Sequence, residues 1–213
     1  MKARRSIFEP LRDAREPYVF LNIIYYGLVA ASMAYTAFDR SLHDTLMTAV
    51  VESLSQGPLA PVLEAYTAQR VLEAIGLTAG INLAVGSFVS ITLPSLIIPF
   101  SGLLMAAFRA LTWGVLFSPQ IGEGLAPGEL ATGVLLGVLV LLEGQGYVLA
   151  ALAAYVQGKA FLRPRAVGKA RHLQGYWHGL KASARIYVLV ALVLLVAAVY
   201  EVLIAVVALP ALL

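Results

Sequence analysis

The sequence predicts an all-α fold: a polytopic transmembrane bundle of about five helices forming one domain over residues 1–213. Hydrophobic residues make up 60% of the chain and charged residues 13%, whereas a soluble domain carries about 25% charged residues. Apolar stretches of about 20 residues recur, the length at which an α-helix crosses the hydrocarbon core of a bilayer. Basic residues gather in segments 1–17 and 159–185, as in the cytoplasmic loops of membrane proteins.

The first span is expected over residues 18–38. The polar segment 39–73 follows, and acidic residues outnumber basic ones in it. Ser41 has the sequence context of a helix start, a Gly-Pro pair interrupts that helix, and Pro61 can begin a second one. We expect these two short amphipathic helices to lie on the membrane surface.

The apolar stretch 74–117 is too long for a single membrane helix. Pro94 and Pro99 divide it, because proline disrupts a helix interior and restricts the residue before it. We expect two spans, 74–93 and 96–117, joined by a tight uncharged turn. A buried break within one membrane helix is the alternative.

Two further spans are expected over residues 130–158 and 186–209. The segment between them, 159–185, contains basic but no acidic residues, and its apolar residues recur at helical spacing. It is expected to form an interfacial amphipathic helix on anionic lipid, with a docking surface for a cytoplasmic partner as the alternative. Nucleic acid is not an expected partner, because the same charges are the ordinary topology signal.

Loop charge sets the expected orientation. The basic segments 1–17 and 159–185 belong on the cytoplasmic side, and the acidic segments 39–73 and 118–129 on the other. An odd number of spans then places the amino terminus inside and the carboxyl terminus outside. We expect a multi-pass protein of the cell membrane, with the lipid bilayer as its first partner.

Four polar side chains interrupt the apolar stretches. An ionised group at the bilayer centre costs roughly 2.5–3.5 kcal/mol on insertion scales, so such residues usually face protein or a hydrated cavity. Each of the four shares a helix face with small residues, where membrane helices approach closely. These intramembrane polar candidates are Asn82, Arg109, Glu143 and Glu201.

Three roles fit these polar residues. The first is structural: they fasten the bundle together, with Arg109 paired to Glu143. The second is functional: one or both glutamates line a path for a proton, an ion or a solute. The third is contact with the membrane helix of a partner protein.

Small residues at helical spacing mark the expected helix contacts. Spacing alone does not separate contacts within the chain from contacts between chains, so a homo-oligomer and a complex with other membrane proteins both stay open. The helix-packing candidates are Gly102, Ala106, Ala110, Gly114, Gly133 and Gly137.

Several kinds of chemistry are not expected. The chain has no cysteine, which excludes disulfides and thiolate sites. Its histidines, His43, His172 and His178, lie outside the expected spans and lack metal-binding spacing. No common catalytic or nucleotide-binding motif occurs. We therefore expect no enzyme activity, no catalytic residue, no cofactor and no metal site.

Three short patterns within the expected spans resemble a known family. Residues 194–201 read LLVAAVYE, residues 142–146 read LEGQG, and residues 81–82 read IN, with Gly86 following. Together they resemble the stage II sporulation protein M family, also called the DUF95 integral membrane proteins. The resemblance implies a polytopic membrane protein without established chemistry.

Our first hypothesis is a non-enzymatic membrane scaffold or complex subunit, since the chain is small and has no clear internal repeat. The alternative is a small transporter or channel whose path passes the four intramembrane polar residues. The interrupted stretch at 94–99 favours the alternative, because broken helices line the sites of many transporters.

Overall fold

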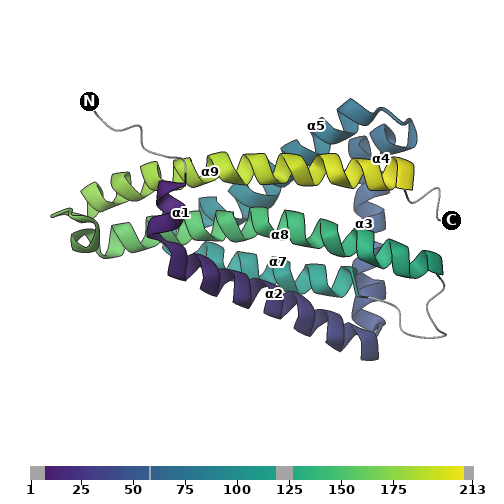
Figure 1. Cartoon of the computed structure of the whole chain (residues 1–213), viewed down its shortest axis with the longest axis horizontal. Helices are drawn as coiled ribbons and strands as arrows, with labels where there is room; N and C mark the ends of the chain where they lie inside the picture. Colours follow the sequence, from purple (N-terminus) through teal and green to yellow (C-terminus); the bar gives the residue numbers. More distant parts are fainter. Residues whose placement is uncertain (1–7, 58, 119–126, 209–213) are drawn as a thin grey trace.

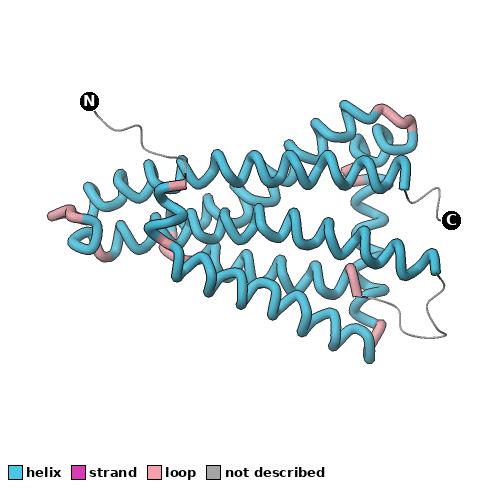
Figure 2. Tube along the Cα trace, viewed as in Figure 1, coloured by secondary structure: helices cyan, strands magenta, loops and turns pink. Residues whose placement is uncertain are grey.

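The computed structural model describes residues 8–57, 59–118 and 127–208, which are helical and contain no strand (Figure 2). The long helices run side by side along the molecule (Figure 1). The all-α class expected from the sequence is therefore confirmed. In chain order the elements are α1 (Glu9–Asp13), α2 (Arg15–Phe38), α3 (Ser41–Gln56), α4 (Ala60–Thr67), α5 (Val71–Ile81), the π-helical η1 (Asn82–Thr92), α6 (Leu93–Ile97), α7 (Ser101–Leu116), α8 (Pro127–Leu162), the 3₁₀ turn η2 (Pro164–Val167), α9 (His172–Leu203) and the π-helical η3 (Ile204–Ala208).

Four helical stretches are long and apolar enough to cross a membrane: Arg15–Phe38, Val71–Ile97, Leu130–Leu162 and His172–Ala208. They correspond to the first, second, fourth and fifth expected spans. The third expected span, 96–117, is the apolar helix α7, whose 16 residues cover about 24 Å. α7 packs mainly along α2. Four of the five expected spans thus have full membrane-crossing length, and the third, α7, is shorter.

The second long helix ends later than its prolines predict. α5, η1 and α6 follow one another without a gap, so the helix passes through Pro94 and ends at Ile97. Pro94 directly follows the π-helical η1, in which the Leu93 N–H still bonds to the Phe88 carbonyl. The missing N–H of Pro94 therefore falls where π-helical bonding changes to α-helical bonding. The turn falls at residues 98–100, and α7 then runs back along the bundle (Figure 1). The turn between the second and third expected spans therefore begins a few residues later than the expected segment 94–99.

Phe100 makes this turn with a left-handed backbone, at φ 70°. Such a conformation is unfavourable for a residue with a side chain, so packing has to hold it. The Phe100 ring lies 5.9 Å from the Tyr155 ring on α8. It also occupies the space above Gly158, where a Cβ atom would come within 3.0 Å of the ring. The turn is therefore held by the packing of the Phe100 ring against Tyr155 and Gly158 of α8.

The basic segment 159–185 does not form the separate interfacial helix that its spacing suggested. α8 continues to Leu162, and α9 begins at His172 and runs unbroken to Leu203. Close packing explains the difference: a Cβ on Gly175 would lie 2.1 Å from the Ala160 carbonyl oxygen. The small residues of this segment face α8, so the two helices stay together beyond their apolar parts.

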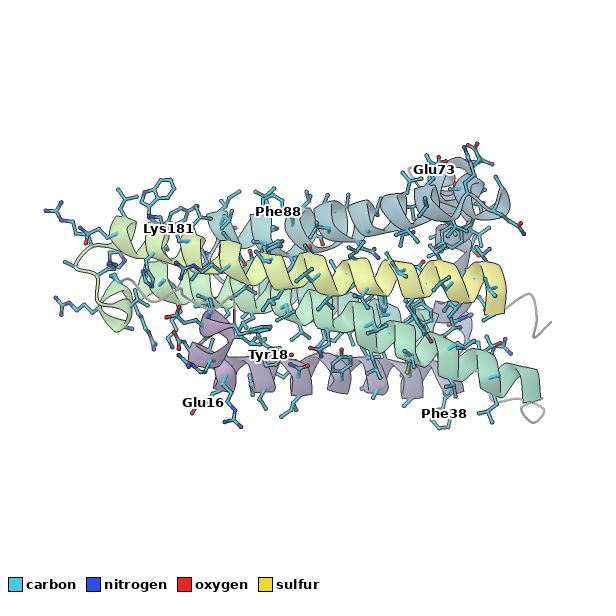
Figure 3. The ribbon with its side chains drawn as sticks, turned by 45° about the horizontal axis from the view of Figure 1, so that its top comes forward. Glu16, Tyr18, Phe38, Glu73, Phe88 and Lys181 are labelled. Atoms are coloured by element: carbon cyan, nitrogen blue, oxygen red, sulfur yellow. The ribbon has the colours of Figure 1, made fainter. Side chains whose placement is uncertain are left out.

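The two ends of the bundle are built differently. The α8–α9 turn, the α6–α7 turn and α1 lie at one end, which we call the basic end. At the opposite end α3 crosses the bundle and α4 leads back into α5 (Figure 1). In Figure 3, Glu16 and Lys181 lie toward the basic end, whereas Phe38 and Glu73 lie toward the opposite end.

The two short helices expected in segment 39–73 are present as α3 and α4. α3 begins at Ser41, as its sequence context predicts. Asp39 stabilises this start by accepting bonds from the Ser41 backbone N–H (3.0 Å) and hydroxyl (2.7 Å), which lower the pKa of the Asp39 carboxyl. The expected acidic loop 118–129 lies largely outside the described residues.

Candidate functional site

Three of the four intramembrane polar candidates meet in one cluster. The Asn82 amide Nδ2 on η1 donates to the Glu143 Oε1 on α8 at 2.6 Å. The Glu143 carboxyl lies in hydrogen-bonding contact with the carboxyl of Glu201 on α9. Three separate helical elements therefore each contribute one polar group to the same place. We call this set, Asn82, Glu143 and Glu201, the carboxyl cluster.

Close packing of α8 against α9 brings the two glutamates together. Gly146 faces Leu194, and a Cβ on Gly146 would come within 2.3 Å of that side chain. The Tyr200 hydroxyl donates to the Leu135 carbonyl at 3.0 Å, which ties the helices again near Glu201. Glu143 is only 3% exposed as a result.

Arg109, the fourth candidate, reaches this cluster through a tyrosine. Its Nη2 donates to the Tyr147 hydroxyl at 3.0 Å, and that hydroxyl donates to the Glu143 Oε2 at 3.3 Å. The guanidinium also lies 4.0 Å from the centre of the Tyr147 ring, a cation–π contact. Arg109 and Glu143 form no direct ion pair within 4.0 Å. The direct pairing considered from the sequence is therefore replaced by a bridge.

A glycine makes room for this bridge. A Cβ on Gly86 would lie 3.1 Å from both the Arg109 Nη2 and the Tyr147 hydroxyl. Gly86 belongs to η1, the π-helical segment that also carries Asn82. π-helical turns are rare and are frequently found at functional sites. The η1 segment thus supplies the Asn82 amide that hydrogen-bonds to Glu143. Through Gly86 it also leaves the space that the Arg109 and Tyr147 side chains occupy.

Tyr66 extends the cluster toward the opposite end of the bundle. It belongs to α4, outside the spans, and its hydroxyl contacts the Glu201 carboxyl and lies 3.3 Å from the Thr78 hydroxyl. Burial raises the pKa of Tyr66, and the neighbouring Glu201 carboxyl adds to this rise. The phenol therefore keeps its proton and can donate it to the hydrogen bond with Glu201.

Sequence reasoning missed both tyrosines. Tyr147 lies one helical turn after Glu143, so helical spacing would have found it on the same face. Tyr66 lies in a polar loop far from the glutamates in sequence, and only the return of α4 against α5 and α9 brings it close. No local signal points to its role.

Further hydroxyl and amide groups continue toward the basic end. The Thr92 hydroxyl at the end of η1 is hydrogen-bonded to that of Tyr187 on α9. Ser87 is fully buried and donates to the Leu83 carbonyl at 2.6 Å. Gln157 on α8 is fully buried, and among the described residues neither polar atom of its amide has a hydrogen-bond partner.

A second polar group fastens α2 to α8 and was also missed. The Tyr18 hydroxyl donates to the Gln145 Oε1 at 2.7 Å, and the Gln145 Nε2 donates to Asn22 and, at 3.1 Å, to the Tyr26 hydroxyl. Every member is neutral and satisfied by its neighbours. This group therefore has the character of a structural contact.

The six small-residue candidates fall into two sets. Gly102, Ala106, Ala110 and Gly114 are all buried. Around Gly133 and Gly137 there is open space, because a Cβ at either position would meet nothing within 4 Å. The first set is used inside the chain, and the second is not.

The fold defines a class: a helical bundle whose long apolar helices suit a polytopic membrane protein. A search for similar proteins among known families, curated proteins and solved structures finds no match to the chain. The carboxyl cluster and the contacts around it are therefore the main guide to function.

Proposed function

We propose that this chain is a small membrane transport protein, or the transport subunit of a complex, in which the carboxyl cluster binds and releases a proton or a cation. The observation that carries this is the contact between Glu143 and Glu201. Neutral amides and hydroxyls would fasten helices at lower cost than two carboxyls in contact. A pair of acids is the arrangement that handles protons and cations.

The neighbours of the pair support a path rather than a single contact. Tyr66 joins Glu201 from outside the spans, and Tyr147 joins Glu143 to Arg109. Two carboxyl groups in contact do not both ionise. The Glu143–Glu201 pair therefore holds a proton that either carboxyl group can carry. Nearer the basic end, the hydroxyls of Thr92 and Tyr187 form a separate hydrogen-bonded pair.

Proton flux into proteoliposomes tests this function directly. A lumenal pH dye, with valinomycin and potassium to clamp the voltage, would report flux through the purified chain. We expect Glu143→Gln and Glu201→Gln each to lower the initial rate about tenfold or more, because glutamine keeps the shape but loses the titrating group. Sodium and potassium gradients without a pH step would test the cation alternative.

Glu52→Gln is the matched control, since Glu52 is an exposed glutamate of α3. Its flux should equal that of the wild type. A wild-type rate no higher than that of empty liposomes, for protons and for both cations, would contradict the transport function. So would equal rates in all three variants.

A second candidate is a scaffold or complex subunit, and one observation favours it. Gly133 and Gly137 lie four residues apart on α8 with open space beside them, the geometry that membrane helices use to dimerise. The resemblance to the stage II sporulation protein M family also points to a complex. The three sequence patterns that carry this resemblance contain Asn82, Glu143 and Glu201, the members of the carboxyl cluster. Kinship with that family is a proposal on this basis.

We further propose that the basic end faces the cytoplasm, as loop charge predicts. Because the chain has no native cysteine, single cysteines can report sidedness without background. An impermeant maleimide added to whole cells should label Glu52→Cys and leave Arg171→Cys unlabelled. The reverse pattern would invert the orientation.

A further inference from the structure

A cavity lies at the basic end, separate from the carboxyl cluster. Its volume is about 810 Å³, and it opens between α1 with the start of α2 on one side and the α8–α9 hairpin on the other. In Figure 3, Glu16 and Lys181, which line it from opposite sides, lie at the same end of the bundle. None of the groups proposed for transport lines it.

The wall formed by α8 and α9 carries an excess of cations. Lys159, Lys181 and Arg185 line it, and Arg15 at the start of α2 lines the rim opposite. Within the described ranges, none of these four has a carboxylate within 4.0 Å. Positive groups gathered around a cavity without anionic partners attract an anion.

The opposite wall carries the acidic groups. Glu9, Asp13 and Glu16 line it beside Arg12 and Arg15, and Asp13 lies 4.0 Å from Arg12. Acidic and basic side chains largely offset one another on this wall, whereas the α8–α9 lining is basic without an acidic residue, so an anion is drawn to the α8–α9 side. The cavity therefore has a defined polarity, with its anion-binding side formed by two rigid helices.

Lysine and arginine side chains are common ligands of phosphate groups. Arginine pairs with two phosphate oxygens at once, and lysine ammonium groups bind phosphate as point charges. Trp177, one turn before Lys181 on α9, is 54% exposed, as is usual for tryptophan at the level of lipid headgroups. We propose that the cavity binds a phosphate ester, with the phosphate held by Lys159, Lys181 and Arg185.

Two probes distinguish the sources of such a phosphate. Glycerol phosphate represents a soluble ester, and dioctanoyl phosphatidylglycerol represents a lipid headgroup. Titration of each into the full chain in a neutral detergent, followed by calorimetry, gives the dissociation constants. Binding of both probes, of the lipid alone or of the soluble ester alone would support the site and identify its source.

A charge-matched pair of variants tests the location. Lys159→Gln, Lys181→Gln and Arg185→Gln combined should weaken binding about tenfold or more, because charge-assisted bonds to phosphate are lost. The control combines Arg163→Gln, Arg165→Gln and Arg171→Gln, which remove the same charge from exposed positions of the same hairpin outside the cavity. It should bind within about twofold of the wild type.

Two results would overturn the site. The first is the absence of measurable binding of either probe to the wild type. The second is an equal loss in the cavity variant and in the control, which would show general attraction to a basic surface. Thermal unfolding of both variants would verify that each is folded. Since the substituted side chains are exposed, we expect little change in their melting temperatures.

Discussion

The two small-residue faces of this protein have similar spacing and opposite surroundings. On α7, Gly102 and Gly114 lie against the backbones of neighbouring helices: a Cβ would come within 2.1 Å of the Ile91 carbonyl oxygen and 2.3 Å of the Val29 carbonyl oxygen, respectively. On α8, Gly133 and Gly137 lie beside open space. Spacing therefore identifies a face suited to close approach, and the register of neighbouring helices decides whether the chain itself uses it.

The largest effect is expected at the buried face. Gly102→Ala should lower the free energy of unfolding by about 3 kcal/mol, because the Ile91 backbone cannot move without shifting η1. Unfolding by sodium dodecyl sulfate from a mild detergent, followed by circular dichroism, would measure it. Gly80→Ala, where a Cβ meets nothing within 4 Å, is the matched control. Equal stability of both variants would remove the distinction between the faces.

A smaller loss in the free energy of unfolding is expected where a glycine faces a side chain instead of a backbone. Gly146→Ala should cost about 1 kcal/mol, because the Leu194 side chain that it meets at 2.3 Å can change rotamer. The same unfolding assay applies. A loss as large as that of Gly102→Ala would show that the α8–α9 contact is as rigid as a backbone contact.

At Gly86 the effect should appear in function more than in stability. Gly86→Ala should cost less than about 1 kcal/mol, because the atoms it meets at 3.1 Å are the ends of the Arg109 and Tyr147 side chains. Displacing them should lengthen the bridge to Glu143 and lower proteoliposome flux several-fold. If both flux and stability were unchanged, the Arg109–Tyr147 bridge would not contribute to transport.

The smallest effect on stability is expected at the open face. Gly137→Leu should change the unfolding free energy by less than about 0.5 kcal/mol, because the added side chain enters open space. If chains associate through this face, crosslinking in membranes should fall while the monomer stays folded. Undiminished crosslinking of this variant would place any self-association elsewhere.

The sequence predicts the helices of this fold better than their ends. Composition and apolar length establish the class, because the bilayer requires long helices with internally satisfied backbones. The prolines predict the turn a few residues before its place at 98–100, because the helix continues through Pro94 where π-helical bonding changes to α-helical bonding. The helical hairpin of residues 159–185 was missed because its charges suggested lipid, while its glycines pack on α8.

The members of the carboxyl cluster could be identified from the sequence, but their meeting could not. Asn82, Glu143 and Glu201 each share a helix face with small residues, which predicts that each turns inward. Which helices are neighbours, and at what level, depends on tertiary packing that no single helix encodes. Tyr66 shows the limit most clearly, because the chain brings it to Glu201 from outside the spans.

The length of the α8–α9 hairpin has a practical consequence. The stretch of α9 from His172 to Arg185 rises by about 20 Å before the apolar part of that helix begins. The η2 turn at its end lies outside the four long apolar helices, so it is a suitable position for an epitope or a fused reporter. The same turn would give an antibody fragment an ordered site to bind at the basic end of the bundle.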